Sequence, residues 1–123
     1  MTIARLIEGR DGVVSCNTGT SVSDAVKLLA EQRIGAVPVL ENGKIAGIFS
    51  ERDVVYQLAQ HGPAMLEKTV GEVMTSPPIT VEASVDALHA LSLMTRRRIR
   101  HLPVVEDGKL KGFVGSNPTL SAI

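Results

Sequence analysis

The stretch Ala36–Val55, AVPVLENGKIAGIFSERDVV, decides how this chain folds. A short apolar run occupies residues 36–40, and a second one follows at residues 45–49. Between the two runs lies the pair Asn42-Gly43, which takes up the positive φ angles of a tight hairpin turn at little steric cost. The pattern therefore predicts two antiparallel strands joined by a short turn.

Helices are expected on both sides of this hairpin. Ser50 is suited to be the N-cap of the following helix, and Asp53 stands three residues later, which is the spacing of a capping box. The preceding helix should begin after Ser21 and end near Gln32–Gly35, because Gly35 is suited to a C-terminal turn.

The same pattern recurs 65 residues later in the chain. Residues 99–114, IRHLPVVEDGKLKGFV, align without a gap on residues 34–49, IGAVPVLENGKIAGIF. The helical positions before each copy correspond as well: Val22, Ala25, Val26 and Leu29 in the first, and Ala87, Ala90, Leu91 and Met94 in the second. Because an internal repeat defines an architecture, we expect an α/β (α+β) fold of two copies, each in the order strand, helix, strand, strand, helix.

The repeat also suggests boundaries. We expect residues 1–62 to form the first repeat with a short N-terminal helix, residues 63–78 to form a connector, and residues 79–123 to form the second repeat. The copies differ after the second hairpin, where Gly115 replaces Ser50 and Pro118 replaces Asp53. The second repeat is therefore expected to be atypical, with a short C-terminal part.

Composition limits the classes of function. The chain has 123 residues and a formal net charge of zero, which argues against capture of nucleic acid or an anionic membrane by charge. Cys16 is the only cysteine, so no intramolecular disulfide can form, and a reducing compartment fits. No apolar run reaches the roughly 18 residues of a membrane span, and the N-terminus lacks a signal-peptide core. We therefore expect a cytoplasmic protein.

Three longer segments carry a resemblance: SVSDAVKLLAEQRIGAVPVLENGKIAGIFSERDVV, TVGEVMT and ALHALSLMTRRRIRHLPVVEDGKLKGFV. In these segments the chain resembles a tandem pair of CBS domains, a Bateman module, and it is most similar to the small stand-alone CBS-pair proteins of bacteria. The resemblance implies two repeats related by a pseudo-twofold axis with their sheets packed together, and a homodimer. It also implies a regulatory module that senses AMP, ADP, ATP or a related adenosyl compound in the cleft between the repeats and acts on an unknown effector protein.

The resemblance assigns ligand-binding roles residue by residue. Asp53 would accept hydrogen bonds from the ribose hydroxyls, while Ser50 and the helix N-terminus would face phosphate. Arg52 and Arg100 can add charge-assisted hydrogen bonds. The remaining implied residues are Ile48 from the first repeat and Thr80, Ile99, His101 and Pro103 from the second. Because position 118 lacks a carboxylate, we expect one competent site, built on Asp53, and one that is weakened or empty.

The Ser50–Asp53 pair, and several other polar residues of the chain, also have a simpler interpretation. In this simpler interpretation, Ser50 and Asp53 form a capping box and have no role in ligand binding. The run Arg96–Arg98 suits a solvated helix C-terminus better than nucleic-acid binding. His61 and His89 show no metal-ligand spacing, and Cys16 is expected to be a small buried residue.

The sequence leaves two functions open. One is the ligand-sensing module, which would require no cofactor beyond its regulatory nucleotide. The alternative is a structural dimerisation module with vestigial clefts. An enzyme is not expected, because no nucleophile stands beside a base, no metal ligands cluster, and no carboxylates pair at a useful spacing.

Overall fold

The structure, a computed structural model, describes residues 1–8 and 13–115. The chain divides into two compact units, one of residues 14–78 and one that joins residues 1–13 to residues 79–123. The end of the second repeat, including Pro118, lies outside the described residues. Within the described ranges, no helix is long and apolar enough to cross a membrane.

A three-stranded sheet forms the base of the first unit. Its strands are β1 (Cys16–Asn17), β2 (Ala36–Glu41) and β3 (Lys44–Ser50), in the order β1-β2-β3. β1 runs parallel to β2, and β2 pairs antiparallel with β3, as the hairpin pattern predicts. Asn42 and Gly43 make the turn with φ angles of 53° and 80°.

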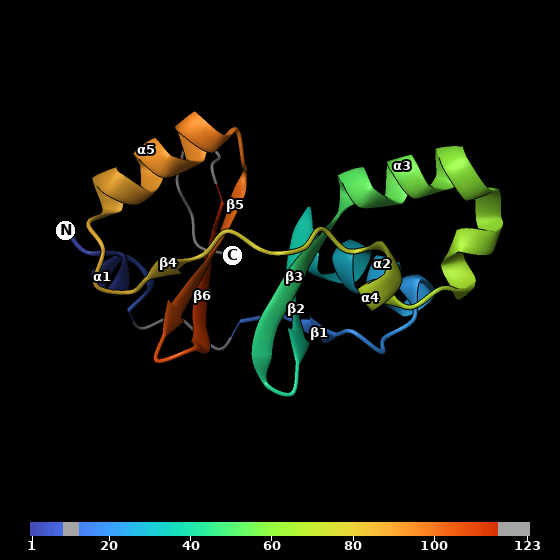
Figure 1. Ribbon diagram of the computed structural model, residues 1–123, viewed down its shortest axis with the longest axis horizontal. Helices are drawn as coiled ribbons and strands as arrows, with labels where there is room; N and C mark the ends of the chain where they lie inside the picture. The colour runs from blue at the N-terminus through green and yellow to red at the C-terminus, as the bar shows by residue number, and fades with distance from the viewer. Residues whose placement is uncertain (9–12, 116–123) are drawn as a thin grey trace. The chain divides into compact units, whose positions relative to one another are not determined.

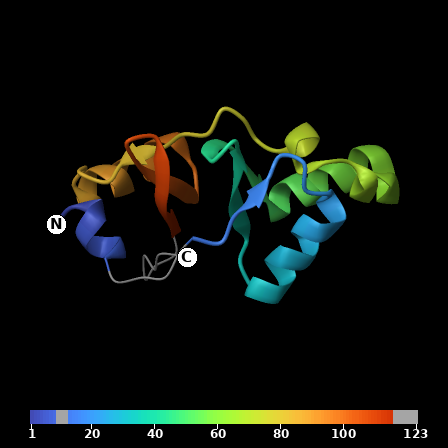
Figure 2. The ribbon, with the colours of Figure 1, turned by 90° about the horizontal axis from the view of Figure 1, so that it is seen from below.

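Helices α2 (Val22–Gln32) and α3 (Glu51–His61) lie on the same side of this sheet (Figures 1 and 2). A 3-10 helix, η1 (Gly62–Glu67), and the short α4 (Val70–Val73) follow α3. Val37, Val39 and Phe49 share one face of the sheet, because side chains alternate along a strand, and all three are buried. Ala36 and Pro38, on the other face of β2, are buried as well. Val37, Val39 and Phe49 form one core with residues from the helices and β1: Cys16, Val22, Ala25, Leu29, Met65, Val70 and Val73.

The second unit repeats the first. It contains α1 (Ile3–Ile7), β4 (Val81–Glu82), α5 (Ala87–Arg97), β5 (His101–Glu106) and β6 (Lys109–Gly115). The strand order is β4-β5-β6, with the same parallel and antiparallel pairings as in the first sheet. Even the register irregularity recurs, between residues 39 and 40 in one sheet and between 104 and 105 in the other. The predicted fold class is therefore confirmed.

The N-terminal helix belongs structurally to the second unit. The backbone N–H groups of Ile3 and Ala4 donate to the carbonyls of Val85 and Ala83, each over 2.8 Å, and Ile3 is buried in the second core. From the sequence this helix is expected to belong to the first repeat, because it precedes that repeat in the chain. In the structure the helix packs on the second unit instead, because the apolar side chain of Ile3 is buried in the core of that unit.

The connector helix α4 occupies the matching place in the first unit. The N–H groups of Val70 and Gly71 donate to the carbonyls of Thr20 and Thr18, over 2.8 and 2.9 Å. Residues 63–78, expected to link the repeats, therefore form part of the first unit, which extends to residue 78. Each unit thus consists of a sheet, its helices and one further short helix, which comes before the strands of the second unit (α1) and after the strands of the first unit (α4).

Candidate functional site

The junction between β3 and α3 carries the predicted capping box (Figure 1). The Ser50 Oγ accepts a hydrogen bond from the Asp53 N–H at 3.3 Å, and the Asp53 Oδ2 accepts one from the Ser50 N–H at 2.9 Å. Ser50 has extended backbone angles, so the chain changes from strand to helix at this residue. The simpler interpretation of Ser50 and Asp53 is therefore confirmed as one of their roles.

The Asp53 carboxylate makes two further contacts. Its Oδ2 also accepts the Ser50 hydroxyl at 3.1 Å, and its Oδ1 accepts the hydroxyl of Thr75 at 3.0 Å. A carboxylate has about four acceptor positions, two on each oxygen. Both positions on Oδ2 are occupied, and one remains on Oδ1. The Asp53 side chain is only partly buried, so this last position can be reached by a ligand.

Thr75, the partner of Asp53 Oδ1, is not among the residues predicted from sequence. Its backbone pairs with Ile48 on β3, with N–H to carbonyl distances of 2.8 and 3.0 Å, and the neighbouring Ser76 hydroxyl donates to the Ala46 carbonyl at 3.1 Å. β3 is an edge strand, and this segment covers part of its open edge. A threonine after a short helix does not by itself indicate a binding role. Its contact with Asp53, 22 residues away in the sequence, becomes visible only in the folded structure.

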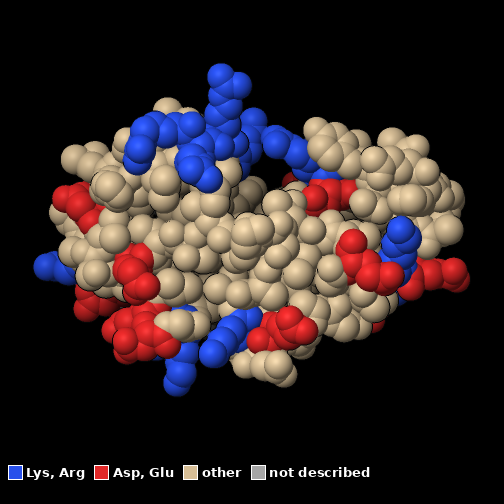
Figure 3. Space-filling view, viewed as in Figure 1, with Lys and Arg blue, Asp and Glu red and all other residues tan. Residues whose placement is uncertain are grey.

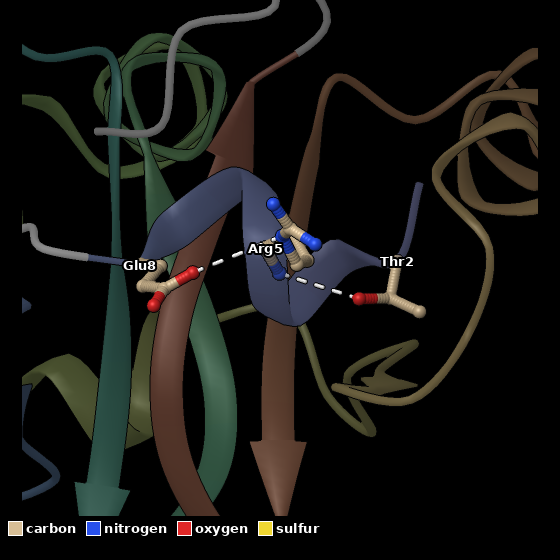
Figure 4. Close-up of polar contacts among 3 residues, drawn as sticks. All are labelled: Thr2, Arg5 and Glu8. Atoms are coloured by element: carbon tan, nitrogen blue, oxygen red, sulfur yellow. Dashed lines mark hydrogen bonds and ion pairs between the residues drawn. The ribbon is translucent and has the colours of Figure 1, made fainter.

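The start of α3 offers less to a phosphate than the sequence suggested. Two of its first three backbone N–H groups are already used, because Glu51 donates to the Gly35 carbonyl at 2.9 Å and Asp53 donates to Ser50. The Arg52 side chain is exposed. Among the described residues, the one ion pair joins Arg5 and Glu8 at 3.9 Å (Figure 4), so the Arg52 side chain is not part of an ion pair. Arg52 is therefore the group here best able to meet an anion.

The remaining predicted residues belong to the second unit. Thr80 comes directly before Val81, which pairs with Val104 in the middle of β5, while Ile99 and Arg100 come directly before the start of β5. On β5, Pro103 is buried and the His101 ring stacks on Phe113 of β6, with centroids 5.5 Å apart and planes at 17°. Phe113 is not among the residues predicted from sequence, and its contact with His101 is a diagonal pair across the hairpin.

The single cysteine is buried, whereas two of the three histidines are exposed. Cys16 is buried, and burial raises the pKa of its thiol to about 11, so it stays protonated near neutral pH. His61 and His89 are exposed. Nowhere in residues 1–8 or 13–115 do three or more His, Cys, Asp or Glu residues form a group that could hold a metal ion.

A family model described as "CBS domain" matches residues 7–60 and 70–116 of this chain, one match for each repeat. The chain belongs to the CBS-domain family. Its sequence is 35 % identical over 113 residues to the mitochondrial CBS domain-containing protein CBSX3 of Arabidopsis thaliana. The match covers 88 % of this chain and 55 % of CBSX3, so the chain spans about half the length of that relative.

Solved CBS structures have the same fold. The CBS-domain protein ATU1752 from Agrobacterium tumefaciens has a TM-score of 0.84 and 34 % identity, and the match covers 94 % of each chain. The CBS domain pair of protein MJ0100, solved with 5′-methylthioadenosine and S-adenosyl-L-methionine, has a TM-score of 0.82 and 26 % identity over 94 % of this chain and 90 % of that one. CBSX2, solved in complex with AMP, has a TM-score of 0.78 and 30 % identity over 93 % and 89 %.

Two surface features of this CBS pair lie outside the predicted site. Lys and Arg side chains gather over α5 (Figure 3), where Arg96, Arg97 and Arg98 are exposed at the helix C-terminus. Cations at this end of a helix are stabilised by its dipole, as the simpler interpretation of the run predicts. On α3, by contrast, Val55 and Tyr56 are each 60 % exposed and Leu58 is 43 % exposed, and no residue of the helix is buried.

Proposed function

We propose that this CBS pair is a regulatory module that binds AMP, ADP, ATP or a related adenosyl compound, and that Asp53 holds the ribose. The observation that supports this most strongly is the Asp53 carboxylate itself. It is held in place by three hydrogen bonds and keeps one acceptor position on Oδ1. Hydroxyl groups of a sugar are natural donors to such a carboxylate.

The ligands of similar proteins fit this emphasis on ribose. CBSX2 was solved with AMP, and the MJ0100 pair with 5′-methylthioadenosine and S-adenosyl-L-methionine. These three compounds share the adenosine group but differ in charge, and 5′-methylthioadenosine has no phosphate. A site that recognises the shared adenosine group needs hydrogen-bond acceptors for the two ribose hydroxyls more than it needs hydrogen-bond donors for a phosphate. This agrees with an α3 N-terminus whose amides are largely used.

Other residues would complete the site. Ile48, half-buried beside Ser50, is proposed to contact the adenine, and Arg52 to meet a phosphate when the ligand has one. From the second unit we propose Thr80, Ile99, Arg100, His101 and Pro103 as further contacts, as the family resemblance implies. Occupancy would shift the balance between two conformations and be recognised by an effector protein.

We propose a single competent ribose site. In the second unit, Gly115 stands where Ser50 stands in the first, and a glycine has no hydroxyl to hold a carboxylate. The residue at the position of Asp53 is Pro118, which offers no side-chain acceptor. Binding of one ligand per chain is therefore expected.

A thermal-shift panel of AMP, ADP, ATP, 5′-methylthioadenosine and S-adenosylmethionine tests the proposal. A ligand at 100 times its Kd stabilises the folded state by about 2.7 kcal/mol, which corresponds to roughly 10 °C in Tm for a chain of this size. Asp53→Ala should abolish the shift. Asp24→Ala is the matched control, because Asp24 occupies the same third position of α2, after the N-cap Ser21. No shift with any compound would contradict the proposal.

A second candidate function is assembly of two copies through α3. The helix exposes Val55, Tyr56 and Leu58, and an apolar hollow of about 480 Å³ lies between α2 and α3, with Arg33 and Glu51 on its wall. Two copies related by a twofold axis could place the Arg33 of one against the Glu51 of the other. Light scattering that shows a dimer, with no ligand binding in the thermal panel, would favour this function over ligand sensing.

A further inference from the structure

The hydroxyl of Thr75 and the carboxylate of Asp53 form a pair of neighbouring oxygen atoms. Thr75 Oγ1 lies 3.0 Å from Asp53 Oδ1 and donates its single hydrogen to it. A hydroxyl oxygen has one hydrogen and two acceptor positions. None of the described residues donates a hydrogen bond to Thr75 Oγ1, and the side chain is exposed. Both oxygens of the pair can therefore still accept a hydrogen bond.

The other carboxylate oxygen cannot take part in this way. Asp53 Oδ2 accepts from both the N–H and the hydroxyl of Ser50, over 2.9 and 3.1 Å, which uses its two acceptor positions. Asp53 alone thus has one free position, whereas a ribose presents two adjacent hydroxyl groups. If Asp53 were the only partner, one of these hydroxyls would find no acceptor on this unit or would have to break the capping box.

We propose that Thr75 is the second acceptor of the ribose diol and makes the site selective for ribose over deoxyribose. One hydroxyl would donate to Asp53 Oδ1 and the other to Thr75 Oγ1. This rests on the proposed function and adds to it a residue outside the Ser50–Asp53 motif. The step involves hydrogen bonds only, so no bond is made or broken.

The position of Thr75 is well fixed for such a role. Its backbone makes two hydrogen bonds to Ile48, and Ser76 holds the Ala46 carbonyl. The preceding residue, Met74, packs on Gly47, where a Cβ would stand 2.6 Å from the Met74 sulfur. Only a glycine at residue 47 lets this segment approach β3 so closely. The Thr75 hydroxyl is therefore presented by a strand-like segment held at four points.

The second unit has no such pair in its described residues. There Ile7 packs on Gly112 as Met74 packs on Gly47, so the residue that matches Thr75 is Glu8. The Glu8 side chain is 74 % exposed and forms an ion pair with Arg5, one turn earlier on α1 (Figure 4). The difference agrees with one ribose site in the chain.

Titration calorimetry with AMP, 2′-deoxy-AMP and 3′-deoxy-AMP tests this role. Thr75→Val keeps the shape of the side chain but removes the hydroxyl, and it should weaken AMP binding roughly three- to tenfold, as expected for one hydrogen bond. One deoxy analogue lacks the hydroxyl that contacts Thr75, and its affinity should be the same for the variant and the native chain. Thr75→Ser should bind AMP like the native chain. Ser76→Ala, which loses only the bond to Ala46, is the matched control.

The outcomes separate the two proposals. If the native chain binds neither AMP nor 5′-methylthioadenosine, the proposed function itself fails. If it binds AMP and Asp53→Ala does not, but Thr75→Val binds AMP unchanged, only the role of Thr75 is wrong. Equal weakening of AMP and both deoxy analogues by Thr75→Val would show that Thr75 acts on the structure and not on the diol, which also overturns the inference.

Discussion

Gly47 lies so close to Met74 that a Cβ atom on residue 47 would stand 2.6 Å from the methionine sulfur. The same Cβ would stand 2.7 Å from the carbonyl oxygen of Thr75. Gly112 has the same relationship with Ile7 in the second unit, at 2.6 Å. These contacts attach a short helical segment to each sheet, α4 in the first unit and α1 in the second, and in the first unit they bring Thr75 next to Asp53.

Gly47→Ala should therefore destabilise the chain, and by more than Gly112→Ala. The flexible ends of Met74 and Ile7 can move aside, but the Thr75 carbonyl is backbone and cannot move without breaking its pairing with β3. Overpacking of this kind costs about 1–3 kcal/mol. Urea denaturation measures the change, with Gly19→Ala as control because nothing lies within 4 Å of a Cβ there. Equal stability of the Gly47 and Gly112 variants would contradict this explanation.

Glu72 should stabilise the protein in a pH-dependent way. The Thr69 N–H and hydroxyl donate to its carboxylate at 2.8 and 3.0 Å, and these hydrogen bonds, the backbone one first, lower the pKa of Glu72 below its ordinary 4.5. Since the folded pKa is lowered, the contribution is complete above the unfolded pKa and is lost as the pH falls through the folded one.

Glu72→Gln should thus lower the free energy of unfolding near neutral pH, and the difference from the native chain should shrink in acid. Denaturation curves at a series of pH values give this difference directly. Glu31→Gln is a suitable control, since that exposed side chain on α2 makes no hydrogen bond recorded for the described ranges. A difference that is constant with pH would be inconsistent with the charged capping box.

The Cys16 thiol should be inert in the folded state. Burial raises its pKa to about 11, and the thiolate is the form that reacts. Alkylation by iodoacetamide near neutral pH, followed by mass spectrometry, should be slow for the native chain and fast in concentrated guanidinium chloride. Rapid modification without denaturant would mean that Cys16 is more accessible than the core of the first unit allows.

The exposed face of α3 should mediate self-association. Val55→Glu places a charge on this face, at a side chain that is 60 % exposed, so it should shift a dimer to a monomer with little effect on the fold. Light scattering and Tm measure the two effects, and Gln60→Glu adds the same charge at an exposed polar position of α3 as a control. A monomeric native chain, or a dimer that tolerates Val55→Glu, would refute this assignment.

The predictions that succeeded from sequence were those set by neighbouring residues. Asn42-Gly43 and Asp107-Gly108 have positive φ angles, as turns of this kind require, and the capping box of Ser50 and Asp53 spans three residues. Helix α2 ends at Gln32, within the predicted range, but its C-cap is not the glycine that the sequence suggested. Arg33, not Gly35, takes the left-handed conformation with φ of 55°, because the N–H of Ile34 can then donate to the Leu29 carbonyl.

Features that depend on distant parts of the chain could not be predicted in this way. The assignment of α1 to the second unit depends on Ile3 and on the contact of Ile7 with Gly112, over 100 residues later in the sequence. Thr75 reaches Asp53 across 22 residues, only after α4 and β3 have packed together. Neither contact leaves a pattern that periodicity or residue type reveals, so neither could be predicted from the sequence.

The central claim is that Asp53 holds the ribose of an adenosyl ligand. A crystal structure of the chain grown with saturating AMP, or with 5′-methylthioadenosine, tests it most directly. We predict one ligand in each chain, with a ribose hydroxyl within hydrogen-bonding distance of Asp53 Oδ1. A ligand whose ribose lies away from Asp53, or a site at Asp53 that stays empty at saturating ligand, would contradict the claim.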